Sequence, residues 1–532
     1  MRIAKVSSTL PGTNQLPPVP IPDDLREQPI QLSENARTVL QKRYLRRGKD
    51  GKPAETEAEM FWRVAYYVAL AEDELGGDVL TAARSYYELL TGLRFFPNSP
   101  TFTGAGTPLG QLAACFTADM RVTTSEGLKR IADLEIGEQV LTHEGRYRTV
   151  SEVFERAYTG GLLKIRIKQI GTPLEVTPEH PILTPQGWVR AGDLKVGDYV
   201  AVGKLDTVES PVAFDLAELQ YPLELEVQQT VDSVRARRPA RYQNSGLQGR
   251  WVARFVPNTP NLARLAGYYV AEGTLGTDCE YVRFTFSKDE TAYHQDVINL
   301  LKSVFGLDAR VGPSNFGNWV TIDVFNRPVA NWFRDHFGSH SYGKKIPLWM
   351  QQAETDYQEQ FLIGLWRGDG LFYERKQTPP SSGGHETTYR KMSLVLANPT
   401  LIHQVWQLCL RLGFDASIRP ADTKYVTPNA RDTAMVSIPP MQAQPLAEKA
   451  FGRTFSQSDK RYIRQTAQRI DGKVYFQVKQ IEVEEYCGTV YNCEVDEDHS
   501  YVIEGVVVHN CFVLAIDDDM GRSESGIFQT LR

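Results

Sequence analysis

The sequence contains little cysteine and no long apolar run, and each shortage excludes a class of protein. Six cysteines among 532 residues are too few for a disulfide-stabilised fold, and none of them forms the CxxC pair that is typical of structural zinc sites. No segment approaches the roughly 20 apolar residues of a membrane-spanning helix, and the N-terminus has no apolar core like that of a signal peptide. We therefore expect a cytoplasmic protein with reduced thiols and no membrane partner.

An excess of positive charge is also missing. The formal net charge is −6, so any binding of nucleic acid must depend on a local basic surface. The hydrophobic fraction of 42% and the charged fraction of 23% are ordinary for globular proteins. The length of 532 residues predicts about three or four domains.

The N-terminal region changes from a proline-rich segment to a helical pattern. Prolines crowd residues 1–30, which predicts an extended arm because proline fixes φ and removes a backbone donor. Apolar residues then recur at spacings of three and four between residues 32 and 93, which indicates helices. A loop rich in proline, glycine and threonine follows and ends at Cys115.

Beyond Cys115 the sequence contains an internal duplication. The segment IADLEIGEQVLT (131–142) aligns with AGDLKVGDYVAV (191–202), and the surrounding short runs are typical of β-strands. The simplest explanation is a duplicated all-β unit. From about residue 471 the pattern is again that of β-strands, so this β unit is expected to finish after a different, inserted domain.

The inserted region contains a second duplication. LAGYYVAEG (265–273) aligns with LIGLWRGDG (362–370), and similar strand-like and helix-like segments follow each copy. An extra loop at 377–386 accounts for the greater length of the second copy. We expect each copy to fold as α-β-α-β-α, in an α+β domain with pseudo-twofold symmetry over residues 260–455.

The region from Cys115 to Asn510 can be removed without disturbing the flanking sequence. Joining the ends gives PLGQLAA followed by CFVLAIDDDM, in which Cys511-Phe512 takes the place of Cys115-Phe116. The Cys115 thiol is a nucleophile that can attack the preceding carbonyl carbon. The side-chain amide of Asn510 can cyclise onto its own carbonyl carbon and break the chain. These features predict a self-excising element.

With Thr177-Pro178-Glu179-His180 inside it and His509-Asn510-Cys511 at its end, the region resembles an intein of the Hint fold. The resemblance covers residues 115 to about 205 and about 471 to 510. Hedgehog-type Hint domains are the nearest alternative. They lack the terminal Asn and the downstream nucleophile, both of which are present here.

The resemblance implies a sequence of acyl transfers that needs no cofactor. Thr177 and His180 would activate the peptide bond between Ala114 and Cys115, and the Cys115 thiol would then take up the acyl group as a thioester.

In the later steps implied by the resemblance, Cys511 would accept the acyl group and form a branched intermediate. Asn510 would cyclise with help from His509 and His499, and an S-to-N shift would leave an ordinary peptide bond across the junction. The sequence departs from the family at Asn492, where Asp is frequent. Steps that Asp would assist are expected to be slower or to use Cys493.

The segments LAGYYVAEG and LIGLWRGDG resemble the paired LAGLIDADG helices of homing endonucleases. Gly267 and Gly364 would let the two helices pack closely, and Glu272 and Asp369 would meet at the helix ends. Two carboxylates at one site can bind Mg²⁺ and activate water for phosphodiester hydrolysis. The expected partner is double-stranded DNA at the uninterrupted host allele, with the sheets in its major groove, because the insertion itself destroys that site.

Two basic features accompany these motifs. Lys345, beside Lys344 in YGKKIPLWM, resembles a segment that can supply a catalytic lysine; a solvated surface lysine is the alternative. An acid-free run of arginines precedes the first motif and suits either phosphate contact or a solvated linker. Its members are Arg235, Arg237, Arg238, Arg241, Arg250 and Arg254.

The flanking segments PNSPTFTGAGTPLGQLAAC and CFVLAIDDDMG resemble the large subunit of ribonucleotide reductases, most closely the adenosylcobalamin-dependent class. The helical pattern over 32–93 suits the N-terminal helical domain of that family. The resemblance implies that Ser99 and Ala114 line the substrate site and that Cys511 is a redox thiol. The mature host would need adenosylcobalamin, a ribonucleotide substrate, a thioredoxin-like reductant and the remainder of the reductase chain.

We therefore expect a multidomain chain in which an all-β Hint horseshoe is split by an α+β endonuclease and flanked by reductase segments. The two functions, self-splicing with a nuclease and ribonucleotide reduction, would belong to different segments. A splicing-competent intein with an inactive nuclease is the alternative. The expected division is 1–114 (N-terminal host segment), 115–206 (first Hint part), 207–259 (basic linker or DNA-contact region), 260–455 (endonuclease), 471–510 (second Hint part) and 511–532 (C-terminal host segment).

Overall fold

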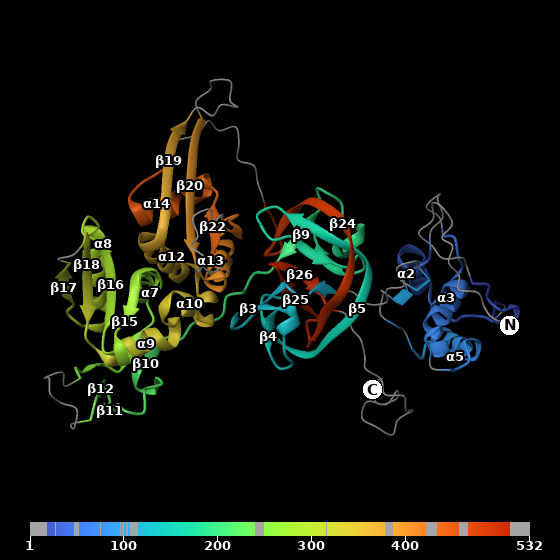
Figure 1. Cartoon of the computed structure of the whole chain (residues 1–532), viewed down its shortest axis with the longest axis horizontal. Helices are drawn as coiled ribbons and strands as arrows, with labels where there is room; N and C mark the ends of the chain where they lie inside the picture. Colours follow the sequence, from blue (N-terminus) through green and yellow to red (C-terminus); the bar gives the residue numbers. More distant parts are fainter. Residues whose placement is uncertain are drawn as a thin grey trace.

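The structure is a computed structural model in which a helical domain, a β domain and an inserted α+β domain follow one another along the long axis (Figure 1). It describes residues 19–510 except 27, 47–52, 75, 96, 98–100, 103–104, 107–114, 240–248, 315–316, 378–386, 422–432 and 457–466. Within the described residues, no helix is both long enough and apolar enough to cross a membrane.

The helices predicted between residues 32 and 93 are present. They are α2 (Glu34–Arg43), α3 (Glu57–Ala69), α4 (Ala71–Glu74) and α5 (Val79–Thr91). The extended arm predicted over residues 1–30 is corrected at one point, because Asp23–Arg26 form the short helix α1. Helix α3 begins with a capping box, because the Thr56 side chain accepts from the Glu59 N–H and the Glu59 carboxylate accepts from the Thr56 N–H. Helices α3 and α5 enclose a core of their own, in which Phe61, Trp62 and Tyr87 are fully buried.

The β domain is built from two segments of chain, residues 115–202 and 467–510. Its strands are β1 (Phe116–Thr117), β2 (Arg121–Thr124), β3 (Gly127–Arg130), β4 (Gln139–Leu141), β5 (Tyr147–Ile167), β6 (Leu174–Val176), β7 (Pro181–Thr184), β8 (Gly187–Arg190), β9 (Tyr199–Val202), β23 (Ala467–Ile470), β24 (Lys473–Val495), β25 (Ser500–Ile503) and β26 (Val506–His509). They form one sheet in the order β23-β24-β1-β6-β5-β4-β2-β25-β26-β7-β8, with β3 and β9 paired at its side.

The first sequence duplication folds twice into the same local structure. Short 3₁₀ turns at Ile131–Asp133 and Ala191–Asp193 each follow a β-hairpin. The residues before these turns, Arg130 and Arg190, have nearly identical backbone angles, with φ/ψ of −62/142 and −63/142 degrees. The repeated frame therefore specifies a repeated hairpin and turn.

Strands β5 and β24 are longer than their sequence patterns indicate. They pair antiparallel from Ile167 opposite Val478 to Val150 opposite Val495, with two register shifts. The apolar runs on either side of Gly160-Gly161 and of Gly488 belong to continuous strands rather than to separate ones. The glycines are accommodated because the partner strand continues the hydrogen-bond ladder across them.

The inserted domain contains two copies of one unit, as expected, but each copy has more strands than the sequence pattern showed. The first copy comprises α7 (Pro260–Glu272), β15 (Gly273–Leu275), β16 (Val282–Ser287), α8 (Thr291–Phe305), β17 (Arg310–Pro313), β18 (Trp319–Val324) and α9 (Arg327–Phe337). After α10 (His340–Gly343) and α11 (Leu348–Gln351), the second comprises α12 (Thr355–Asp369), β19 (Gly370–Gln377), β20 (Thr387–Leu396), α13 (Pro399–Arg411), β21 (Ser417–Pro420), β22 (Ala434–Ile438) and α14 (Pro440–Phe451).

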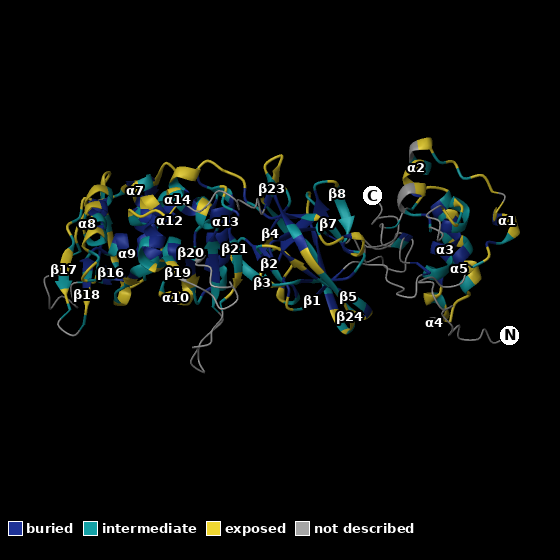
Figure 2. Ribbon diagram, turned by 90° about the horizontal axis from the view of Figure 1, so that it is seen from above, coloured by how far each residue is buried: buried dark blue, intermediate teal, exposed yellow. Residues whose placement is uncertain are grey.

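The expected α-β-α-β-α order of each copy is therefore corrected to α-β-β-α-β-β-α. The two sheets have the orders β15-β16-β18-β17 and β19-β20-β22-β21. The central strands were predicted from their apolar alternation, whereas the missed strands are the edges, which carry polar and glycine residues. Figure 2 shows the buried residues gathered between these sheets and the helices.

The segment expected as a basic linker, 207–259, is folded. It forms a two-stranded sheet, β10 (Ala213–Asp215) with β14 (Phe255–Pro257), and a three-stranded sheet, β11 (Glu226–Gln229), β12 (Ser233–Arg237) and β13 (Val252–Ala253). Val234, Val252 and Val256 are buried in the same core as α7. The described part of the segment therefore packs against the inserted domain, and its contact with DNA stays a prediction.

The inserted domain contacts the β domain through polar groups. The Gly171 N–H donates to the Ile418 carbonyl oxygen at 2.8 Å. His403 Nε2 lies 3.1 Å from the Thr123 hydroxyl, and both side chains are buried.

Candidate functional site

The start of the excisable region is held by reciprocal hydrogen bonds to the predicted Thr177. The Cys115 N–H donates to Thr177 Oγ1 at 2.9 Å, and the Thr177 N–H donates to the Cys115 carbonyl oxygen at 3.0 Å. Both residues are buried. The nitrogen of the peptide bond that precedes Cys115 is therefore fixed against the threonine hydroxyl.

The predicted His180 lies beside Phe116, the residue that follows Cys115. Its ring is fully buried and packs on Phe116, with ring centroids 4.3 Å apart. The turn 177–180 joins β6, which pairs with β1, to β7, which pairs with β26. One turn thus connects the neighbour of the first strand to the neighbour of the last.

The Cys115 thiol is in an environment that opposes its ionisation. Burial raises the pKa of the thiol, Arg156 on β5 lowers it through charge and a hydrogen bond, and Glu179 raises it. Burial also raises the pKa of the Glu179 carboxyl. The sequence patterns pointed to Thr177 and His180 but gave no signal for Arg156, which reaches the thiol only through strand pairing.

At the other end, Asn510 is buried and lies between two histidines. Its N–H donates to the His499 carbonyl oxygen at 3.0 Å. The Asn510 carbonyl oxygen lies 2.8 Å from His509 Nδ1, and the His509 ring packs edge-on against Trp188, with centroids 4.9 Å apart. Burial lowers the pKa of His509, which favours the neutral ring. A neutral ring protonated at Nδ1 can donate to the oxygen of the carbonyl group whose carbon is attacked in cyclisation.

The departure from the family at Asn492 has a structural account. Asn492 is buried, and its Oδ1 accepts from the Tyr501 hydroxyl at 2.6 Å and from the Cys493 N–H at 2.8 Å. Burial raises the pKa of the Cys493 thiol, which is fully enclosed in the core. Cys493 is therefore a poor substitute for an acid at position 492.

A carboxyl group that the sequence analysis missed lies beside Asn510. Glu494 is 7% exposed, and its Oε1 lies 3.1 Å from His499 Nδ1. Burial raises the pKa of Glu494, whereas interactions with the His499 side chain and the nearby Asn510 side chain lower it. The sequence signal available was only its alternation with Asn492 on one strand.

In the inserted domain, the two motif helices α7 and α12 pack through their glycines. A methyl group at Gly267 would overlap the Phe361 carbonyl oxygen, and one at Gly364 would overlap the Arg264 carbonyl oxygen. The contact is reciprocal, as pseudo-twofold symmetry requires. It brings together the C-terminal ends of the helices, where Glu272 and Asp369 are the last residues.

Glu272 is half-buried and Asp369 is exposed at the helix end, yet the pKa values of both carboxyl groups are raised. Burial, followed by the charge of Asp369, raises the pKa of Glu272 to about 7. Burial raises the pKa of Asp369 to about 6 although Lys344 lowers it. Two neighbouring carboxyl groups that repel each other fit a divalent cation, whose coordination other oxygen ligands would complete. Within the described part of the chain, no group of three or more His, Cys, Asp or Glu residues is placed to hold a metal ion.

The lysine near these carboxyl groups is Lys344 rather than the predicted Lys345. Lys344 is buried, and its Nζ donates to the Tyr269 and Val270 carbonyl oxygens at 2.9 Å each. Burial lowers its pKa to about 8, against the charges of Asp369 and Glu272. Lys345 instead forms a surface ion pair of 3.2 Å with Glu126 of the β domain.

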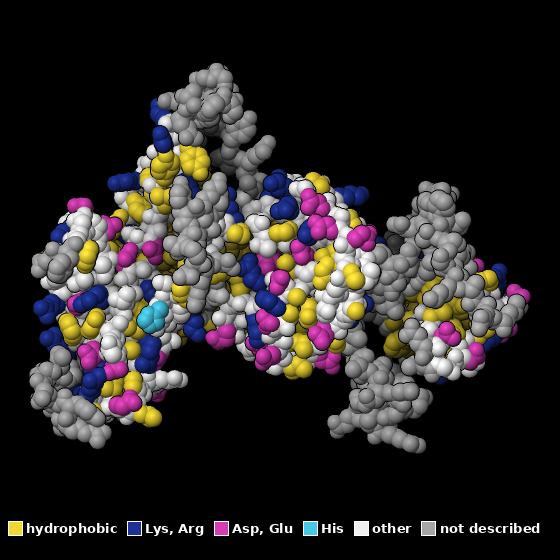
Figure 3. All heavy atoms as spheres, in the orientation of Figure 1, with side chains coloured by type: hydrophobic (Ala, Val, Ile, Leu, Met, Phe, Trp, Pro, Cys, Tyr) yellow, Lys and Arg dark blue, Asp and Glu magenta, His cyan; other side chains and the backbone are white. Residues whose placement is uncertain are grey.

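Most of the predicted arginine run is already paired. Arg237 pairs with Glu226, Arg238 with Asp278 and Arg254 with Asp215, while Arg235 lies over the Trp251 ring at 4.6 Å. Figure 3 shows Lys and Arg side chains interspersed with Asp and Glu on the displayed face. The described arginines therefore serve the local fold, and their contact with DNA stays a prediction.

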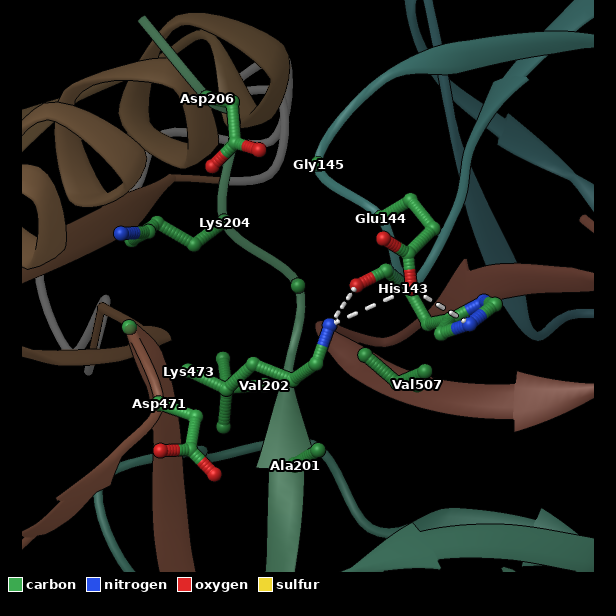
Figure 4. A pocket seen from close by; sticks show the side chains of 12 residues that line it. His143, Glu144, Gly145, Ala201, Val202, Lys204, Asp206, Asp471, Lys473 and Val507 are labelled. Carbon is green, nitrogen blue, oxygen red and sulfur yellow. Dashed lines mark hydrogen bonds and ion pairs between the residues drawn. The ribbon is translucent and has the colours of Figure 1, made fainter.

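A small cavity lies beside the strand that leads to Asn510 (Figure 4). Its volume is about 190 Å³, and its polar lining includes His143, Glu144, Lys204 and Lys473. Lys473 Nζ donates to the His143 carbonyl oxygen at 2.7 Å. His143 Nδ1 lies 2.7 Å from the hydroxyl of Ser500, the residue opposite His509 in the sheet. His143 in the cavity lining thus contacts the strand that pairs with the one carrying His509.

Several predicted positions lie outside the described residues. These are Ser99, Ala114, Cys511, Arg241 and residues 378–386 of the predicted extra loop.

Comparison with known families gives two matches. Residues 30–110 match the ribonucleotide reductase all-alpha domain, and residues 118–510 match the intein splicing domain.

Curated relatives match in two different regions. A stretch of 422 residues, 74% of the chain, is 26% identical to the ATP-dependent DNA helicase Hel308 of Thermococcus kodakarensis and covers 36% of it. A stretch of 88 residues, 16% of the chain, is 46% identical to the vitamin B12-dependent ribonucleoside-diphosphate reductase of Mycobacterium tuberculosis and covers 13% of it. The chain spans about a third to a half of the length of the relatives that match it most extensively.

Two solved structures are similar to separate parts of the chain. The gp41-1 intein is 28% identical, with 17% of this chain and 68% of that chain covered and a TM-score of 0.16. I-DmoI in complex with DNA and Mn is 11% identical, with 37% and 98% covered and a TM-score of 0.26.

Proposed function

Since the chain belongs to the intein family, through its match over residues 118–510, we propose that it excises residues 115–510 from itself and joins Ala114 to Cys511. The observation that carries this proposal is the turn 177–180. It places Thr177 on Cys115 and links the strand beside the first junction to the strand beside the second. A single rigid element thus positions groups for both ends.

In the first step, Thr177 and His180 act on the peptide bond before Cys115. The threonine hydroxyl holds the amide nitrogen, and the buried imidazole of His180 supplies a proton to it as the Cys115 sulfur attacks the Ala114 carbonyl carbon. The amide becomes a thioester, and Cys511 then takes the acyl group.

In the last step, Asn510 cyclises and releases the excised segment. His509 donates to the Asn510 carbonyl oxygen, which makes that carbon more electrophilic as the side-chain nitrogen attacks. Because each step exchanges one acyl bond for another, the reaction needs no external energy.

The test of splicing uses two substitutions in the full chain. The wild type should yield the free segment 115–510 and the ligated flanks, identified by mass spectrometry. Cys115→Ala should abolish thioester formation, and Asn510→Ala should abolish release of the C-terminal flank. Ligated flanks from the double variant would refute the proposal.

We further propose that the inserted domain is a DNA endonuclease whose catalytic groups are Glu272, Asp369 and Lys344. Glu272 and Asp369 would hold Mg²⁺, which supplies an activated water and charge neutralisation for phosphodiester hydrolysis. Lys344 supplies a positive charge beside them from a buried position. The target would be double-stranded DNA that encodes the uninterrupted Ala114–Cys511 junction.

The nuclease test uses a plasmid with that junction, purified protein and Mg²⁺. Asp369→Asn should abolish cutting and leave excision of 115–510 unchanged. Lys344→Met should lower the cutting rate by about 100-fold, whereas Lys345→Met, which loses only a surface pair, should cut within threefold of the wild type. Equal loss in both lysine variants would refute the assignment of Lys344. A wild type that splices but does not cut would favour the alternative, an inactive nuclease.

For the host, the match over residues 30–110 supports a segment of a ribonucleotide reductase. We propose that the ligated flanks enter an adenosylcobalamin-dependent reductase, in which Ser99 and Ala114 line the ribonucleotide site and Cys511 is a redox thiol. The remaining reductase chain and a thioredoxin-like reductant would complete that enzyme. The test is ribonucleotide reduction by the full reductase. The enzyme whose Ala114–Cys511 bond was formed by splicing is compared with one expressed without the inserted segment.

A further inference from the structure

A buried carboxyl group at the second junction has no role in the steps above. Glu494 projects from β24, and its Oε1 is engaged by His499 at 3.1 Å. Its other oxygen, Oε2, is buried and has no hydrogen-bond partner within the described part of the chain. Burying an unpaired carboxylate oxygen is costly, so this arrangement requires an explanation.

The side chain of Asn510 lies near this unpaired carboxylate oxygen. That side chain lies close enough to lower the pKa of Glu494, yet its nitrogen Nδ2 is also buried and makes no hydrogen bond of normal geometry to a described residue. An unsatisfied donor and an unsatisfied acceptor thus lie side by side. Catalytic hydrogen bonds are often poorly aligned before the reacting geometry forms.

We propose that Glu494 is a catalytic residue of asparagine cyclisation, in which its Oε2 accepts a proton from Asn510 Nδ2. The proposal rests on the proposed splicing function and deepens it. In this step the bond from Nδ2 to the Asn510 carbonyl carbon forms, and the bond from that carbon to the Cys511 nitrogen breaks. One proton moves from Nδ2 to Glu494, which returns one proton to the departing amine.

Of the side chains on β24 near Asn510, Glu494 is the one suited to accept a proton. Asn492, two residues earlier, has no ionisable group, and its Oδ1 is occupied by Tyr501 and the Cys493 N–H. His499 holds Oε1 of Glu494, which orients Oε2 away from the imidazole and fixes the carboxyl plane. The carboxyl group therefore supplies here the acid–base function for which position 492 has no suitable side chain.

The charged groups that face Glu494 set the pH dependence of the step. His499 lies within hydrogen-bond distance of Glu494, and Glu152 on β5 is the Cα partner of Glu494. His509 contacts the Asn510 carbonyl oxygen. Because the carboxylate is the proton acceptor, the cyclisation rate should rise with pH as Glu494 ionises. Removal of the carboxyl group should flatten that rise.

The test follows full chains made by cell-free translation, with gel and mass-spectrometric time courses. Glu494→Gln should slow release of segment 115–510 by about 100-fold and accumulate the branched intermediate. Glu494→Asp should recover at least tenfold of that loss. Glu152→Gln, a matched control that removes the facing carboxylate from β5, should stay within threefold of the wild type.

Two further readouts separate catalysis from folding. Dithiothreitol should cleave the chain before Cys115 in Glu494→Gln as fast as in the wild type, and only the cyclisation rate should lose its rise with pH. Release from Glu494→Gln at the rate of Glu152→Gln, or equal loss of the dithiothreitol cleavage, would overturn the proposal. A wild type that neither splices nor releases a flank would instead refute the proposed splicing function.

Discussion

At the residue scale, the reactivity of Cys115 depends on neighbours with opposing effects. Burial raises the pKa of its thiol, while Arg156 lowers it. The nucleophile is the thiolate, so the thioester step should be slow at neutral pH and accelerate as the pH rises from 7 to 9. The positive charge of Arg156 limits the rise in the thiol pKa that burial causes.

Replacement of Arg156 by Gln should therefore slow thioester formation by about tenfold at pH 7.5, because loss of a close positive charge raises the thiol pKa by about one unit. The measurement is the rate of dithiothreitol cleavage before Cys115 as a function of pH. Arg148→Gln is the matched control, since Arg148 lies on the same strand but pairs with Glu497 at the surface. Similar rates for the two variants would contradict this role of Arg156.

The residues that sequence patterns revealed are those fixed by local chemistry. Cys115, Thr177, His180, His509 and Asn510 belong to junctions or short motifs, and the structure brings each set to its junction. The missed residues reach their sites from other elements.

Arg156, Glu494 and Lys344 have no local pattern that marks them. Glu494 reaches Asn510 because β24 and the last strands share a sheet, and Lys344 reaches Glu272 because its loop folds over the end of α7. Lys344 and Lys345 are adjacent and identical in type, so only burial distinguishes them. Such information is tertiary and is absent from the spacing of residues.

At the element scale, the close approach of α7 and α12 depends on two glycines. Gly267→Ala would place a methyl group on the Phe361 carbonyl oxygen, and the helices would have to separate. Overpacking of this kind should cost about 1–3 kcal/mol of unfolding free energy. The measurement is chemical denaturation of the Cys115→Ala, Asn510→Ala precursor.

The matched control for this substitution is Gly343→Ala. Gly343 has nothing within 4 Å of the added methyl group and does not have a left-handed backbone. The control should change the free energy of unfolding by less than about 0.5 kcal/mol. An equal effect at both positions would show that helix contact is not what Gly267 provides.

Helices and central strands could be predicted from the regular spacing of their apolar residues, whereas the strands at the sheet edges could not. Strand β16 alternates buried and partly exposed residues and β18 is mostly buried, whereas their edge partners β15 and β17 are short and contain glycine or proline. An edge strand needs hydrogen bonds from one neighbour only and buries less apolar surface. Its sequence is therefore less constrained.

At the scale of the whole molecule, the helical domain has a core distinct from the one shared by the β and inserted domains. In a precursor blocked by Cys115→Ala and Asn510→Ala, calorimetry should therefore resolve two unfolding transitions. Phe61→Ala, which empties the helical core, should destabilise one transition by about 3–5 kcal/mol and leave the other in place. A single transition that shifts as a whole would show that the two cores unfold together.

The chain leaves the β domain after β9 and returns to it at β23, which pairs with β24, and Val202 on β9 and Val474 on β24 are Cα partners. For the sheet, the segment between β9 and β23 is one very long loop. The entropy of closing a loop grows only with the logarithm of its length, by about 0.6 kcal/mol for each doubling. Over evolutionary time the whole inserted domain could thus be gained or deleted, with no strand of the β domain having to change its partner.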